Sequence, residues 1–200
     1  DLDNAPDCGY TDFVYNGDKD AAQKFLSGAG NWLFRLRMGG TSPNAKSYSI
    51  MIDTDGLFGN TGASADPNYS IYNPGFEIEI VLATKFGVYV YDINVPNCTP
   101  VISYPGTTNY QKSVALSTVC GDADYFLDFY VPFAALTTQF GVTQATAMRY
   151  AIVSNTGSNT CTACSPSSAS DVAGTGSFTS LAAALTTVFD AQGPCAPNGT

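Results

Sequence analysis

Two segments of this chain alternate apolar and polar side chains with a period of two, the pattern of a β-strand with one buried face. In residues 31–38, Trp32, Phe34, Leu36 and Met38 lie on one face, and Leu33, Arg35 and Arg37 on the other. The segment Phe-Glu-Ile-Glu-Ile does the same with Glu77 and Glu79, the only 2 glutamates among 200 residues. If these strands are neighbours in one sheet, the sheet has one apolar face and one charged face.

Similar alternation recurs along most of the chain, whereas helical periodicity is rare. Further strands are expected at 11–15, 47–53, 76–82, 86–93, 110–116, 124–131 and 148–154. A helical turn is expected at 133–136 and a short helix at 180–189, while 18–26 reads as a helical turn or a loop. The sequence therefore predicts an all-β fold, most simply an antiparallel β-sandwich with minor helix and Trp32 in its core.

The length and composition fit one domain of the larger all-β kind. We expect residues 1–200 to form this single domain, with the sandwich core at about 30–153 and decorating excursions at 94–123 and 155–200. The net charge of −9 and the pI near 4.1 disfavour nucleic-acid partners and anionic membrane surfaces. The sequence contains no apolar run of about 18 residues, so it predicts no membrane-spanning helix.

The 6 cysteines indicate disulfides and an extracellular or cell-surface location. Sequence separation favours Cys8–Cys195 between the chain ends, Cys98–Cys120 across the first excursion, and Cys161–Cys164 within a tight loop. The pairing stays open, because spacing alone does not choose among the alternatives. Asp1 at the start, with no methionine, suggests the mature or excised segment of a longer exported chain.

The segment 53–56, Asp-Thr-Asp-Gly, is the strongest local motif. Two carboxylates one residue apart, followed by a glycine for a sharp turn, suit a hard cation such as Ca²⁺. Asp53 and Asp55 are the expected ligands, and Asp66 or backbone carbonyls of the following loop complete the shell. The alternative is a plain turn at the end of a strand, made by the aspartate side chains.

The charged face admits three interpretations. Glu77 and Glu79 as paired carboxylates suit a glycoside hydrolase. Cross-strand pairing with arginine makes them a structural ladder. A ligand-binding face is the third, since tyrosine rings stack on sugars and charged groups bind their hydroxyls. Its expected residues are Arg35, Arg37, Glu77, Glu79, Tyr89 and Tyr91.

The ordered set of segments resembles a DOMON-like β-sandwich, and among named groups the family 9 carbohydrate-binding modules. The segments that carry this resemblance are Trp-Leu-Phe-Arg-Leu-Arg-Met (32–38), Tyr-Ser-Ile-Met-Ile-Asp-Thr-Asp-Gly (48–56), Phe-Glu-Ile-Glu-Ile (76–80), Val-Tyr-Val-Tyr-Asp (88–92) and Phe-Leu-Asp-Phe-Tyr-Val-Pro-Phe (126–133). The resemblance covers about residues 30–153 and implies a non-catalytic jelly-roll sandwich, often stabilised by calcium at the positions of Asp53 and Asp55. The single tryptophan departs from the stacking pair of the xylan- and cellulose-binding modules.

The expectation from the sequence is therefore a non-catalytic extracellular module of a secreted or cell-surface bacterial protein, an adhesin, that binds carbohydrate and is stabilised by calcium. Its partner is a glycan or another copy or domain of a surface protein. The first alternative is a structural subunit or assembly domain of an extracellular filament or stalk. A glycoside hydrolase that uses Glu77 and Glu79 is the second.

Overall fold

The computed structural model describes residues 8–15, 17, 21–95, 97–158, 161–173, 179 and 181–187. Within them, the strands are β1 (Ala22–Leu26), β2 (Asn31–Met38), β3 (Ser47–Asp53), β4 (Ile78–Ala83), β5 (Gly87–Asp92), β6 (Ile102–Pro105), β7 (Tyr110–Val114), β8 (Tyr125–Pro132), β9 (Arg149–Asn155) and β10 (Ala169–Val172). Two helices, α1 (Phe133–Phe140) and α2 (Leu181–Thr187), and the 3-10 turn η1 (Pro166–Ser168) complete the described elements.

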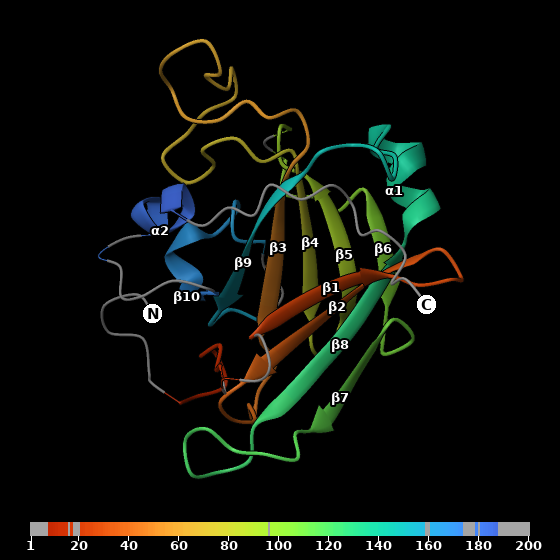
Figure 1. Ribbon diagram of the computed structural model, residues 1–200, viewed down its shortest axis with the longest axis vertical. Helices are drawn as coiled ribbons and strands as arrows, with labels where there is room; N and C mark the ends of the chain where they lie inside the picture. The colour runs from red at the N-terminus through yellow and green to blue at the C-terminus, as the bar shows by residue number, and fades with distance from the viewer. Residues whose placement is uncertain are drawn as a thin grey trace.

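The strands form two antiparallel sheets packed as a sandwich (Figure 1). The order is β1-β2-β8-β7 in the four-stranded sheet and β10-β9-β3-β4-β5-β6 in the six-stranded sheet. The all-β fold class is thus confirmed. The strands β2 and β4, which the alternation placed on one charged face, belong to different sheets.

The core lies between the sheets and follows the predicted alternation. Trp32, Phe34, Leu36 and Met38 of β2 are buried, and they pack with the inward side chains of both sheets. Each β2 residue faces a β8 residue, from Asn31 opposite Pro132 to Met38 opposite Tyr125. Burial of these large apolar side chains supplies the main driving force for folding.

Several edge elements differ from the expectation. Residues 22–26 form strand β1, although Lys24 falls among the inward positions and interrupts the apolar pattern. Its ammonium lies 3.7 Å from the centre of the Tyr150 ring. Strands β6 and β10 lie in segments expected to be loops, whereas residues 11–15 make only an isolated bridge, Phe13 with Met38.

The outer face of the six-stranded sheet is covered. Met51, Phe76 and Val153 pack there against Leu181 and Leu185 of α2, which lies beside β10 in Figure 1. A short helix near 180–189 is therefore confirmed. None of the described helices is long and apolar enough to cross a membrane.

The disulfides differ from the pairs that separation favoured. Cys8 is joined to Cys120, which corrects both Cys8–Cys195 and Cys98–Cys120. The Cys164 sulfur lies at bonding distance from both Cys98 and Cys161. One sulfur forms one disulfide, so these two bridges are alternatives. Cys195 lies outside the described residues.

Candidate functional site

The root of the long loop between β3 and β4 gathers three carboxylates. This loop projects beyond one end of the sandwich (Figure 1). Asp53 ends β3, Asp55 follows in the turn, and Glu77 lies just before β4. One oxygen from each of the three lies within 4.8 Å of the others. Because β3 and β4 are paired neighbours, the sheet itself holds Glu77 opposite the turn.

A network of backbone hydrogen bonds shapes the turn. Asp53 Oδ1 accepts from the N–H of Asp55 at 3.1 Å and from that of Gly56 at 2.7 Å. Gly56 has φ of 78°, a conformation that glycine adopts without steric cost. Glu77 Oε2 accepts from the Thr54 N–H at 2.6 Å and from its hydroxyl at 3.0 Å. The turn predicted as the structural alternative is therefore present, and it leaves one oxygen each of Asp53 and Glu77 outside this network.

The charges at this site do not balance. Asp53 is 1% exposed, and its Oδ2 accepts no hydrogen bond from the described residues. The Arg149 Nε lies 3.2 Å from that oxygen, an ionic contact without hydrogen-bond geometry. Arg149 also donates from Nη2 to the Gly56 carbonyl at 2.7 Å. Among the described residues, one guanidinium thus lies beside three carboxylates, which leaves two negative charges when all three are ionised.

Burial and mutual repulsion make these carboxylates hard to ionise. Burial, followed by the negative charges of Asp55 and Asp53, raises the pKa of Glu77 to about 7, although hydrogen bonds from Thr54 lower it. Burial likewise raises the pKa of Asp53, against the lowering effect of the Gly56 N–H and Arg149. A bound cation would relieve both costs by neutralising the charge.

The donor set fits Ca²⁺ and differs from the predicted one in one member. Calcium prefers carboxylate and carbonyl oxygens in a flexible arrangement, and these three carboxylates supply such oxygens. Asp66 is not part of the group. It is 6% exposed, and its Oδ1 accepts from the Asn68 N–H at 2.5 Å. Among the described residues it is therefore Glu77, and not Asp66, that lies with Asp53 and Asp55.

The six residues of the predicted ligand-binding face do not come together, because their strands lie in different sheets. On the outer face of the four-stranded sheet, Arg35 pairs with Asp128 through two hydrogen bonds of 2.6 and 2.7 Å. Arg37 is 1% exposed and pairs with the buried Asp124. The proposed ladder of glutamates and arginines is therefore wrong. Arg35 pairs with Asp128 of β8, and Arg37 pairs with Asp124, which directly precedes β8.

Glu77 belongs to the carboxylate group described above, whereas Glu79, Tyr89 and Tyr91 lie on the six-stranded sheet, near the loop of Cys161 and Cys164. Glu79 is fully buried and accepts from the backbone N–H groups of Thr162 and Ala163. Tyr91 is 6% exposed and packs against Cys161. Tyr89 is half-buried and donates to the Phe86 carbonyl at 3.1 Å. The Glu79 carboxylate is thus buried, whereas glycoside hydrolysis uses two carboxylates that flank the substrate's scissile bond.

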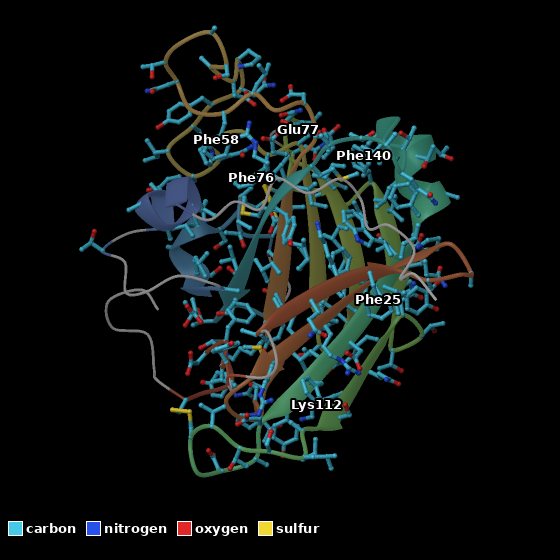
Figure 2. All side chains as sticks on the ribbon, in the orientation of Figure 1. Phe25, Phe58, Phe76, Glu77, Lys112 and Phe140 are labelled. Carbon is cyan, nitrogen blue, oxygen red and sulfur yellow. A yellow bond between two sulfur atoms is a disulfide. The ribbon has the colours of Figure 1, made fainter. Side chains whose placement is uncertain are left out.

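A cavity of about 180 Å³ opens at the other end of the sandwich. Figure 2 shows Glu77 and Lys112 at opposite ends of the molecule. Tyr48, Met38 and Leu127 form its buried floor, and Tyr110 and Tyr125 stand half-buried around it. Its other lining residues are Gly40, Thr41, Ser42, Asn44, Thr84, Lys85 and Lys112.

No sequence motif indicated this cavity. Its lining comes from the end of β2, the start of β3, the turn between β4 and β5, from β7 and β8, and from the loop 39–46. No local motif joins these segments, because each contributes one to four residues. The only sequence signal was the turn composition of residues 39–44, which marks a loop but not what faces it.

Comparison of this chain with protein-family models, with curated proteins and with solved structures gives no match.

Proposed function

We propose that this protein is a non-catalytic, extracellular β-sandwich module that recognises carbohydrate at the cavity beside the loop 39–46 and is stabilised by calcium at the opposite end of the sandwich, at the root of the loop 54–77. An adhesive protein of a bacterial surface is the setting that the resemblance to DOMON-like domains implies. The assignment to these two ends replaces the single charged face that the sequence suggested.

The observation that supports recognition is the cavity between the sheets. Ligand sites in proteins are concave, largely apolar or aromatic, and carry a few placed polar groups. Tyr110 and Tyr125 offer ring faces for the apolar side of a sugar. Neither tyrosine hydroxyl donates a hydrogen bond within the described part of the chain. Hydroxyl and amide groups at the rim, from Thr41, Ser42 and Asn44, suit the hydroxyls of a sugar.

The calcium part rests on the Asp53, Asp55 and Glu77 group. The buried Asp53 Oδ2 has the ionic contact with Arg149 but accepts no hydrogen bond from the described residues, and buried polar atoms seldom lack one, so a cation ligand role suits it. Two uncompensated negative charges match one divalent cation. Calcium there would stabilise the root of the loop 54–77 and so lock one end of the sandwich.

The extracellular part rests on the cysteines. Described cysteines lie at disulfide distance in two separate places, Cys8 with Cys120 and Cys164 with its two neighbours. Disulfides persist in oxidising environments, whereas the cytosol keeps thiols reduced. This supports a secreted or surface-exposed module.

A glycan array probed with the domain in calcium and again in chelator tests recognition. We expect specific hits that weaken about fivefold or more in Tyr125→Ala, because a stacking ring contributes roughly 1 kcal/mol or more. Tyr89→Ala is the matched control, since Tyr89 lies on the six-stranded sheet outside the cavity, and its hits should persist.

Two results would count against the proposal. A blank array with folded, calcium-loaded protein would favour the alternative of a structural subunit with protein–protein contacts. Hits that disappear in Tyr89→Ala but persist in Tyr125→Ala would place recognition on the face first suggested by the sequence.

A further inference from the structure

We infer that the end cavity selects a carboxylate-bearing sugar, such as a terminal hexuronic acid of an acidic polysaccharide. This inference rests on the proposed carbohydrate recognition and names its ligand class. It is carried by two lysines that line the cavity, Lys112 from β7 of the four-stranded sheet and Lys85 from the turn between β4 and β5 of the six-stranded sheet.

The charge of the cavity is opposite to that of the protein. The chain carries 17 acidic and 8 basic residues, yet the described residues that line the cavity include two lysines and no aspartate or glutamate. A third lysine, Lys46, lies at the same end and donates to the Thr156 carbonyl at 2.8 Å. An anion is therefore attracted to this end and repelled by most of the remaining surface.

Contacts with the protein hold both ammonium groups at the rim. Lys112 donates to the Thr41 hydroxyl, and its Nζ lies 4.5 Å from the centre of the Tyr125 ring. Lys85 donates to the Pro43 carbonyl at 3.3 Å. An ammonium carries three N–H donors, and each lysine has one such bond here, so donors remain for a carboxylate. Charge-assisted hydrogen bonds of this kind are stronger than neutral ones.

Size and lining argue for a sugar acid and against a bare inorganic anion. The volume of about 180 Å³ falls below the ~300–1,000 Å³ of pockets for drug-sized ligands, which suits one ring. An inorganic anion would use the lysines but not the rings of Tyr110 and Tyr125. A uronic acid uses the ring faces, the rim hydroxyls and both charges.

Isothermal titration with oligogalacturonate, and with the neutral galactose oligomer of equal length, tests this inference at low and high salt. We expect the uronate to bind at least about tenfold more tightly than the neutral oligomer, with the difference shrinking at high salt. Lys85→Gln with Lys112→Gln should remove this preference, whereas the double arginine variant should keep it. Lys46→Gln is the matched control, since Lys46 does not line the cavity, and its preference should persist.

The outcomes separate this inference from the proposed function. Equal binding of neutral and acidic oligomers, or a preference that survives the double glutamine variant, overturns the choice of an acidic sugar and leaves carbohydrate recognition standing. Acetate or sulfate binding as tightly as the uronate overturns the role of the sugar ring. No binding of any saccharide by folded protein overturns both.

Discussion

The buried carboxylate of Glu79 accepts a hydrogen bond from the backbone N–H of Ala163 at 3.1 Å, and a second from the N–H of Thr162. These bonds attach the loop of Cys161 and Cys164 to the centre of the six-stranded sheet. Burial raises the pKa of Glu79, while hydrogen bonds from Ser49, Ala163 and Thr162 lower it. The glutamate that looked like a ligand-binding group is thus an anchor for a covering loop.

Glu79→Ala should therefore destabilise the fold strongly. It leaves two backbone N–H groups under the loop without an acceptor, and each unsatisfied buried group costs about 1–3 kcal/mol. We expect a loss of roughly 3 kcal/mol or more in the free energy of unfolding, measured by urea denaturation. Glu79→Gln keeps one carbonyl acceptor and should cost less. A loss below about 1 kcal/mol in the alanine variant would show that the loop does not depend on this carboxylate.

The two arginines of β2 should differ sharply on truncation. Arg37 and Asp124 are 1% and 0% exposed, 2.5 Å apart, whereas the Arg35 side chain is 42% exposed. Breaking a buried pair leaves an uncompensated charge, so Arg37→Ala should cost about 3–5 kcal/mol. Arg35→Ala should cost at most about 1 kcal/mol, because solvent screens the exposed pair. Equal losses in urea denaturation would contradict the difference in burial.

Calcium should raise the thermal unfolding midpoint, because a ligand that binds only the native state stabilises it by mass action. The midpoint should fall back when excess chelator removes the ion. Asp55→Asn should abolish this rise, and Asp55 is exposed enough for the variant to fold. The measurement is thermal unfolding followed by circular dichroism at neutral pH.

Asp66→Asn distinguishes between two sets of calcium ligands: the sequence predicts Asp66 as the third carboxylate, whereas the structure places Glu77 there. The variant keeps an Oδ1 acceptor for the Asn68 N–H, so its baseline midpoint should change little. Its calcium-dependent rise should match that of the wild type. Loss of the rise in Asp66→Asn would restore the ligand set predicted from the sequence.

Without calcium, acidification should stabilise this protein through Glu77. Its pKa in the folded state is about 7, above the ordinary value of 4.5, so between these values the folded state binds more protons than the unfolded state. The free energy of unfolding then falls as pH rises through this window and levels off above it. The pH-dependence should be smaller in Glu77→Gln, with a remainder from Asp53 and Glu79, whose pKa values burial also raises.

The check is denaturant unfolding from pH 4.5 to 8 in metal-free buffer, for the wild type and Glu77→Gln. With calcium present, protons and the ion compete for the same carboxylate, so the stabilisation by calcium should be larger at pH 8 than at pH 5. The same slope in both proteins would mean that Glu77 does not titrate in this range.

Peptide mapping by mass spectrometry under non-reducing conditions should find Cys8 linked to Cys120, across a separation of 112 residues. It should find Cys164 in a single bridge with Cys98 or Cys161. Cys8→Ser with Cys120→Ser should lower stability by about 2–5 kcal/mol, as loss of a native disulfide commonly does. A peptide that links Cys8 to Cys195 would restore the pairing favoured by separation.

The alternation of side chains in the sequence was enough to place β2 and β3 at their observed bounds, and to identify β4, β5, β8 and β9. It was enough because burial of one face needs a period of two wherever a strand covers a core. The turn at 53–56 was also predictable, since its hydrogen bonds join residues at most three apart. Strand β1 was not predicted, because the inward Lys24 interrupts the alternation of apolar and polar side chains.

Only the tertiary structure decided which strands became neighbours. Arg37 and Glu79 both lie on alternating strands, yet β2 and β4 belong to different sheets, so one arginine pairs with Asp124 and the glutamate lies under a distant loop. Strand pairing depends on contacts far apart in the sequence, and local periodicity carries no information about the partner. For the same reason, the fold alone brought Glu77 to the carboxylates of the turn, and Lys85 and Lys112 to one cavity.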